Sequence, residues 1–102
     1  MPKYSFTDAA EHDLERIIDH TLEYWGAGQA EKYVSGLKEL AQSLAENPKL
    51  GVRRNDLLEE LLIFSYSSHI LYYFEQPHGI TIIRILHGRM DANKHISKEN
   101  IT

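Results

Sequence analysis

Apolar residues recur every three or four positions along two long stretches in the first half of the chain. This spacing places them on one side of a helix, and the first helix is expected to begin at Thr7 or Asp8. A second helix is predicted over residues 29–46, because the proline of Asn47-Pro48 cannot continue it. The segment Gly26-Ala27-Gly28 separates the two, which predicts an antiparallel helix hairpin. The residues expected to form the buried stripe are Ala10, Leu14, Ile17, Ile18, Thr21, Leu22 and Trp25 in the first helix, and Ala30, Tyr33, Val34, Leu37, Leu40, Ala41 and Leu44 in the second.

The other regular segments are short and rich in β-branched and aromatic residues, which is typical of strands. Lys3–Phe6 is one such segment before the helices, and residues 49–56 are predicted to be a loop. Three further runs are separated by turn residues alone, so they should pair as consecutive antiparallel hairpins. The runs are Leu61–Tyr66, Ile70–Glu75 and Ile80–Leu86. The start of the first run is open, because Leu57–Leu62 could form a helical turn instead of a strand. The order β-α-α-β-β-β predicts an α+β fold with the helix hairpin packed on one face of an antiparallel sheet.

The last of these runs contains a charged residue and ends in polar ones. Arg84 lies between two isoleucines, and a buried cation is costly unless it is paired. We therefore expect either a structural ion pair with a carboxylate on a neighbouring element, or recognition of a carboxylate on a partner. The turn His87-Gly88-Arg89 follows, with Met90 and Asp91 directly after it.

Both faces of the predicted strands are apolar, and one helix pair covers a single face. The other face should stay partly uncovered, and an exposed apolar surface usually marks an interface. A partner segment could add a strand to an edge or lay an amphipathic helix in a groove. The tyrosines of the strands fit either this surface or the core, with hydroxyls at its edge. The residues predicted to recognise a partner are Arg84, His87, Arg89, Met90, Asp91, Tyr66, Tyr72 and Tyr73.

Length and composition narrow the class of protein. The 102 residues suffice for one domain, residues 1–102, with a flexible tail expected over about residues 93–102. No apolar run approaches the roughly 20 residues that cross a bilayer, and the N-terminus lacks the apolar region of a signal peptide. The absence of cysteine excludes disulfides and thiolate metal sites. We expect a cytoplasmic protein with no membrane partner.

The net charge of −4 is unevenly distributed. Residues 1–46 carry nine acidic and four basic side chains, and residues 47–102 carry six and seven. A dedicated nucleic-acid binder is usually strongly basic, because neutralising phosphates dominates its affinity. We therefore expect no direct sequence-specific binding of nucleic acid.

Ribonuclease chemistry is the enzymatic alternative. It needs an acid and a base near the 2′-hydroxyl and cations around the phosphate. His87 could transfer the proton, Arg84 and Arg89 could hold the phosphate, and the tyrosines could stack on bases. Between Asp56 and Leu86, however, Arg84 is the only lysine or arginine. This low density of cations disfavours the nuclease.

A metal site is also weakly indicated. His87, Asp91 and His95 are spaced four apart, which would place them on one side of a helix. Gly88 makes a continuous helix from His87 unfavourable. No nucleotide-binding fingerprint or catalytic triad is visible. We expect no metal and no cofactor.

The order and spacing of several short motifs resemble the ParE toxins of the RelE/ParE superfamily of bacterial toxin–antitoxin systems. The matching positions run along nearly the whole chain. They are Ala10, Asp13-Leu14, Ile17, Trp25-Gly26, Gln29-Ala30, Tyr33, Asn47-Pro48, Leu50-Gly51, Ser68-His69-Ile70-Leu71-Tyr72-Tyr73, Ile83-Arg84-Ile85-Leu86-His87 and Met90-Asp91.

The resemblance implies a toxin that inhibits DNA gyrase and so stops replication, and that is neutralised by direct binding of a ParD-like antitoxin. RelE-type relatives share the fold but cleave mRNA on the ribosome, so the fold does not choose the target. One segment departs from the family pattern. Where the family commonly has Gly-Tyr-Arg or Gly-Leu-Arg, this protein has Glu60-Leu61-Leu62. A family member with lost or altered toxicity is therefore a third interpretation.

Overall fold

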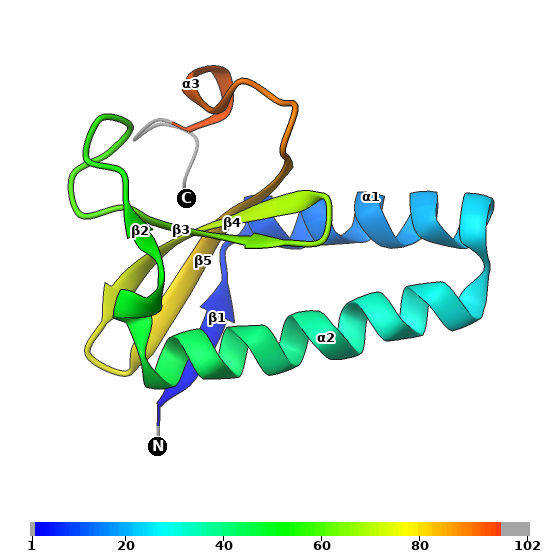
Figure 1. Cartoon of the computed structure of the whole chain (residues 1–102), viewed down its shortest axis with the longest axis horizontal. Helices are drawn as coiled ribbons and strands as arrows, with labels where there is room; N and C mark the ends of the chain where they lie inside the picture. Colours follow the sequence, from blue (N-terminus) through cyan, green and yellow to red (C-terminus); the bar gives the residue numbers. More distant parts are fainter. Residues whose placement is uncertain (1, 97–102) are drawn as a thin grey trace.

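The chain forms a helix hairpin packed against a five-stranded sheet (Figure 1). The computed structural model describes residues 2–96. Its strands are β1 (Lys3–Phe6), β2 (Val52–Arg53), β3 (Leu62–Tyr66), β4 (His69–Gln76) and β5 (Gly79–His87). Its helices are α1 (Asp8–Trp25), α2 (Ala27–Glu46) and α3 (Ala92–His95), with a short 3-10 helix at Pro48–Leu50.

The strands lie in the order β1-β5-β4-β3-β2, so β5 and β4 form the centre of the sheet. The pairs β3–β4 and β4–β5 are antiparallel hairpins, as the three strand runs predict. The α+β fold with a helix hairpin on the sheet is therefore confirmed. Two details differ: β1 runs parallel to β5, which makes the sheet mixed, and β2 adds an edge strand inside the predicted loop at residues 49–56.

Local interactions set the ends of the two long helices. Thr7 caps α1: its hydroxyl accepts a hydrogen bond from the Ala10 N–H and donates one to the Ile83 carbonyl of β5. Gly26 alone joins the helices, because α2 begins at Ala27 rather than near Gln29. At a φ of +88°, Gly26 adopts a conformation that L-residues rarely tolerate.

An irregularity in the β4–β5 ladder changes which residues of β5 face the helices. The register shifts between Tyr72 and Tyr73, which pair with Arg84 and Ile82 and leave Ile83 as the extra residue. Ile82 and Ile85, three residues apart, consequently pack in the same core beneath the helices. This helix-side core also contains Ala10, Tyr33, Leu37, Ala41, Leu44, Leu62, Leu71, Tyr73 and Ile80.

The opposite face of the sheet has its own small core, but it stays partly uncovered, as predicted, because Ile63, Ile70 and Phe74 are only partly buried there. Its buried residues are Leu61, Tyr72, Ile83, Leu86 and Ile96. The turns that precede β3 contribute Leu57 and Leu58 to this cluster, and the C-terminal segment contributes Ala92 and Ile96. Figure 1 shows α3 on the side of the sheet away from α2. The protein's own turns and C-terminal segment therefore cover only part of this second face.

The C-terminal segment is ordered further than predicted. Within the segment expected to be a flexible tail, residues 93–95 belong to α3 and Ile96 is buried. Burial of an isoleucine provides the free energy that orders these residues. The remainder of the predicted tail, residues 97–102, lies outside the described residues. Within residues 2–96, no helix is both long enough and apolar enough to cross a bilayer.

Candidate functional site

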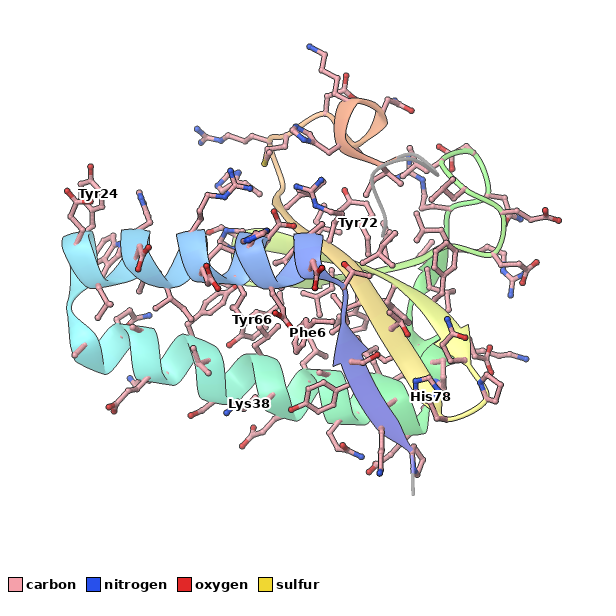
Figure 2. The ribbon with its side chains drawn as sticks, turned by 180° about the vertical axis from the view of Figure 1, so that it is seen from behind. Phe6, Tyr24, Lys38, Tyr66, Tyr72 and His78 are labelled. Atoms are coloured by element: carbon pink, nitrogen blue, oxygen red, sulfur yellow. The ribbon has the colours of Figure 1, made fainter. Side chains whose placement is uncertain are left out.

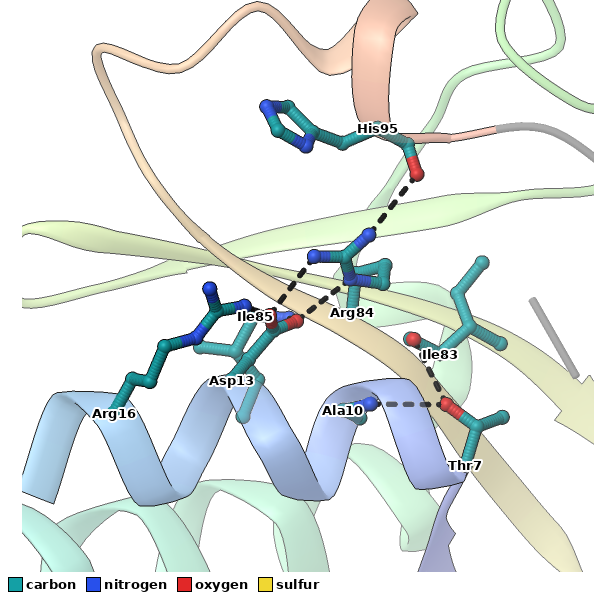
Figure 3. Close-up of polar contacts among 8 residues, drawn as sticks. All are labelled: Thr7, Ala10, Asp13, Arg16, Ile83, Arg84, Ile85 and His95. Carbon is teal, nitrogen blue, oxygen red and sulfur yellow. Dashed lines mark hydrogen bonds and ion pairs between the residues drawn. The ribbon is translucent and has the colours of Figure 1, made fainter. Parts of the chain in front are cut away.

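Asp13 of α1 and Arg84 of β5 form an ion pair between the helix hairpin and the sheet (Figure 3). The Arg84 guanidinium donates from Nε to Asp13 Oδ2 at 2.7 Å and from Nη2 to Asp13 Oδ1 at 2.9 Å. The side chain of Asp13 is 4% exposed and that of Arg84 is 11% exposed. This bidentate geometry is the one that arginine favours with carboxylates.

Both partners of the ion pair have further hydrogen bonds. Asp13 also accepts from the backbone N–H of Ile85 at 2.9 Å and from Arg16 Nη2 at 3.2 Å, while Arg84 Nη1 donates to the His95 carbonyl at 3.2 Å. The hydrogen bond to Asp13 raises the pKa of Arg84 above its ordinary value, although burial lowers it. This confirms the expected structural ion pair with a carboxylate on a neighbouring element, which was one of the two interpretations of Arg84.

Sequence reasoning did not single out Asp13 as a site residue. A signal was present, because Asp13 lies on the buried stripe of α1, three residues after Ala10 and four before Ile17. An acidic residue at such a position requires a buried cation or donor. Arg84 was the one cation in the three predicted strands of the meander, so the two could have been matched.

Two histidines lie side by side where β4 begins and β5 ends. His69 and His87 are paired in the β4–β5 register, and their ring centroids are 5.6 Å apart. The Nδ1 of His69 lies 3.3 Å from the hydroxyl of Tyr33 on α2. Burial lowers the pKa of His69, and the nearby His87 and His20 lower it further. His69 was not predicted as a site residue, because only the pairing register reveals its neighbour.

The turn after β5 brings the other predicted polar residues together. The backbone N–H of Arg89 donates to His87 Nδ1 at 3.1 Å, and the Met90 N–H donates to the His87 carbonyl at 2.9 Å. Asp91 caps α3 through a hydrogen bond from the Asn93 N–H. The side chains of Arg89, Met90 and Asp91 are exposed. Of the predicted recognition residues, these three and the half-buried His87 remain available to a partner.

The strand tyrosines are largely internal, which fits the core interpretation better than the partner surface. Tyr72 and Tyr73 are buried on opposite faces of the sheet. The Tyr73 hydroxyl donates to the Pro48 carbonyl at 2.7 Å, and burial raises the pKa of Tyr73 to about 12. Tyr66 lies between the sheet and α2 (Figure 2), where its hydroxyl donates to the Tyr33 carbonyl at 2.8 Å. The hydroxyls of Tyr66 and Tyr73 bind the protein's own backbone, as an assignment to the core predicts.

The exposed apolar side chains lie elsewhere. The hairpin tip carries Leu22, Tyr24 and Trp25, and Trp25 is 73% exposed. The prediction that Leu22 and Trp25 belong to the buried stripe of the first helix is therefore wrong, because α1 extends beyond the sheet at this end. Figure 2 shows Tyr24 pointing outward where α1 ends. A pocket of about 430 Å³ runs between the helices on their outer side. It is lined by Ile18, Leu22, Ala27, Ala30, Glu31, Val34 and Ser35.

The departure at Glu60-Leu61-Leu62 has a structural account. Glu60 has a φ of +68°, a conformation in which glycine is favoured. Its carboxylate pairs with Arg53 at 2.8 Å, and its N–H donates to Asn55 Oδ1 at 2.9 Å. Leu61 is buried on the outer face and Leu62 in the helix-side core. Apolar burial thus occupies the position where the family commonly has an arginine.

Metal-binding side chains do not converge in the described part of the protein. Groups of three or more His, Asp or Glu side chains placed to hold one ion are absent from residues 2–96. The predicted set of His87, Asp91 and His95 is divided by the turn at Gly88, with Asp91 serving as the cap of α3.

Comparison with known proteins places the protein in a family. Residues 4–92 match the family model described as ParE toxin of type II toxin-antitoxin system, parDE. Toxin ParE1 of Mycobacterium tuberculosis is 34% identical over 95 residues, which cover 92% of this sequence and 97% of that protein. Toxin ParE1 of Caulobacter vibrioides is 29% identical over 96 residues, covering 94% and 99%.

A solved structure supports the fold. The chromosomal ParDE TA system from P. aeruginosa contains a protein that superposes with a TM-score of 0.69 at 22% identity. The match covers 85% of this protein and 96% of that one. The family-model match along residues 4–92 and the 34% identical relative establish that the chain belongs to the ParE toxin family of type II toxin–antitoxin systems.

Proposed function

We propose that this toxin acts without catalysis, by binding DNA gyrase and so stopping replication, and that a ParD-like antitoxin neutralises it by direct binding. Membership of the ParE family supports both partners. The proposed place of action is the cytoplasm, where gyrase meets the chromosome.

The observation that carries the non-enzymatic part is the Asp13–Arg84 ion pair. A ribonuclease of the RelE type would need free cations around a scissile phosphate. Here the guanidinium of the central strand is bound by a carboxylate of the same protein. Two more arginines of the described region, Arg53 and Arg54, are bound by Glu60 and Asp56. Few cations on the sheet therefore remain to stabilise a charged transition state.

The pocket between α1 and α2 that Leu22 and Val34 line, called the outer groove from here on, supports the proposed binding of an antitoxin. Leu22 and Val34 line this mainly apolar groove of about 430 Å³, and Trp25 is exposed at the end of α1, two residues before the lining residue Ala27. Exposed apolar channels between helices accept the apolar face of a partner helix. Antitoxin segments that are disordered when free can fold in such a channel.

A supercoiling assay tests the gyrase target. Purified toxin should inhibit the supercoiling of relaxed plasmid by gyrase near stoichiometric amounts, and the antitoxin from the adjacent reading frame should restore it. Gyrase that remains fully active under excess folded toxin would contradict the proposal. A parallel translation assay with a defined mRNA separates the alternative, since mRNA cleavage on ribosomes would favour the RelE-type activity.

Trp25 gives a direct readout of antitoxin binding, because it is the only tryptophan in the sequence. Antitoxin docked in the outer groove should shift the emission of Trp25 to shorter wavelength. Leu22→Glu should weaken binding at least tenfold, since it places a charge on apolar surface. Val52→Glu is the matched control, because Val52 is also exposed and apolar but lies on the far edge strand. Equal affinity of both variants would exclude the groove.

A further inference from the structure

A second pocket lies beside the Asp13–Arg84 ion pair. It has a volume of about 370 Å³, and it is enclosed by α1, by the ends of β4 and β5 and by the segment after β5. Arg16, His69, His87, His95 and Met90 contribute to its lining. Arg16 and Arg84 approach Asp13 from opposite sides in Figure 3. Its volume admits a carboxylate-sized group with its neighbouring atoms.

Both paired histidines of this pocket use their Nδ1 atoms within the protein. His87 Nδ1 accepts a hydrogen bond from the backbone N–H of Arg89. A backbone N–H can only donate, so His87 Nδ1 carries no proton. His69 Nδ1 lies at hydrogen-bond distance from the Tyr33 hydroxyl, and burial raises the pKa of Tyr33, so this hydroxyl keeps its proton. We assign Nδ1 of each ring as the acceptor. A neutral imidazole that accepts at Nδ1 carries its proton on Nε2, so each ring retains an Nε2–H donor.

The fixed charges around the pocket sum to one positive charge. Arg16 and Arg84 contribute two cations and Asp13 one anion. The oxygens of Asp13 already accept from Arg84, Ile85 and Arg16. The side chain of Arg16 is 75% exposed and has further N–H groups that can donate to another acceptor. The pocket therefore offers donors and positive charge in excess of the acceptors that Asp13 supplies.

We propose that this pocket is a subsite for one carboxylate of a protein partner, bound by the Nε2–H groups of His69 and His87 and by the Arg16 guanidinium. This inference rests on the proposed function only where it concerns which protein the partner is. A carboxylate in this position would accept from the two Nε2–H groups and from the N–H groups of Arg16 that Asp13 does not use. An acidic side chain of the partner and its terminal carboxylate supply the same chemistry.

The surroundings favour a single carboxylate over the backbone of a nucleic acid. A polyanion gains affinity by neutralising many phosphates, and this pocket has one surplus cation. The helix that forms one wall carries five further acidic residues, which repel a polyanion. They are Asp8, Glu11, Glu15, Asp19 and Glu23.

An NMR titration of the imidazole signals tests the subsite on the full-length protein without a partner. Sodium acetate is added at constant ionic strength, with sodium chloride as the compensating salt. Saturable shifts are expected for the imidazole 15N signals of His69 and His87. His78 is the internal control, because it lies in the β4–β5 turn at the opposite end of these strands (Figure 2).

Two variants with the same change of charge make the test specific. Arg16→Gln removes the exposed cation of the pocket and should weaken acetate binding about tenfold, in line with a charged hydrogen bond. Lys38→Gln removes an exposed cation from α2, outside the pocket, and should leave binding unchanged. Both positions are exposed, so both variants should fold.

Each other outcome overturns the inference. Equal, non-saturating shifts of His78, His69 and His87 would show a general salt effect. If Arg16→Gln binds acetate with unchanged affinity, the Arg16 guanidinium does not take part in the site. A short single-stranded thymidine oligonucleotide is titrated in the same way. If it shifts the His69 and His87 signals at a lower concentration than acetate does, the ligand of the pocket is a nucleic-acid backbone and not a carboxylate. Loss of gyrase inhibition is measured separately, so a failure of the proposed function is distinguishable from a failure of the subsite.

Discussion

Asp13 of α1 and Arg84 of β5 are 71 positions apart in the sequence, and they form a buried bidentate ion pair. The same carboxylate accepts the N–H of Ile85, so it also binds the backbone of the strand. The pair therefore joins the helix hairpin to the centre of the sheet, and through His95 it reaches the C-terminal segment. It fixes the relative position of three elements.

Breaking this pair should destabilise the protein strongly. Arg84→Gln leaves the Asp13 carboxylate buried without its cation, and an uncompensated buried charge costs about 3–5 kcal/mol. For a domain whose total free energy of unfolding is roughly 5–15 kcal/mol, this is a large loss. Urea unfolding followed by circular dichroism measures it.

An exposed ion pair provides the control. Arg53→Gln removes the partner of Glu60, and both side chains are exposed, so the cost should stay below about 1 kcal/mol. If Arg84→Gln is as stable as Arg53→Gln and loses only antitoxin or gyrase binding, Arg84 is a recognition residue. The structural role assigned to it here would then be contradicted.

His69 should make stability fall in mild acid. Burial and the nearby His87 and His20 lower its pKa from the ordinary value of 6.5, so the unfolded chain binds this proton more readily. The stabilising contribution is fully present above pH 6.5 and is lost as the pH falls below that value. His69→Gln keeps a hydrogen-bonding group but removes the titration, so its free energy of unfolding should vary less between neutral and mildly acidic pH. An imidazole titration of His69 with a midpoint at or above 6.5 would refute this.

Two substitutions of Glu60 should separate backbone strain from charge. Glu60→Gly and Glu60→Ala both lose the ion pair with Arg53, but only glycine relieves the positive φ. The glycine variant should be more stable than the alanine variant by about 0.5–1 kcal/mol, after its larger loss of backbone entropy is counted. Paired thermal or urea unfolding gives the difference. An alanine variant of equal or greater stability would mean that the left-handed conformation carries no strain.

Ile96 should stabilise the core on the outer face of the sheet. Ile96→Ala removes buried methyl groups next to Leu61, Tyr72, Ile83 and Leu86, and should cost about 2–4 kcal/mol. Met90→Ala, in the exposed turn before α3, should change stability by no more than about 0.5–1 kcal/mol. Chemical unfolding of both variants makes the comparison. A neutral Ile96→Ala would show that the C-terminal segment does not cover this face in solution.

The elements could be read from the sequence because their signals are local. Helix periodicity, the proline of Asn47-Pro48 and the glycine at Gly26 act within a few residues, and the structure places the elements within two residues of most predicted ends. The two-residue strand β2 was missed, because Val52–Arg53 has no pattern long enough to detect. Its existence depends on pairing with Leu62 and Ile63.

The polar residues were only partly assignable. The sequence indicated that Arg84 needs a carboxylate, but not that Asp13 supplies it. His87 was singled out, whereas its neighbour His69 and the exposed Arg16 were not. The sequence left Tyr72 and Tyr73 open between the core and a partner surface, whereas the structure buries Tyr73 beneath the helices and Tyr72 in the core on the outer face.

The amino-acid pattern by itself determined the two helices, the three-strand meander and the family. It did so because these depend on short-range periodicity and on the order of motifs along the sequence. Only the tertiary structure decided the parallel pairing of β1, the partial covering of the outer sheet face and the partner of Arg84. The irregularity at Ile83 shifts the alternation of β5 by one residue, and the packing of α1 on the sheet then places Asp13 within reach of Arg84. Contacts between residues this distant are fixed by packing, which no local pattern specifies.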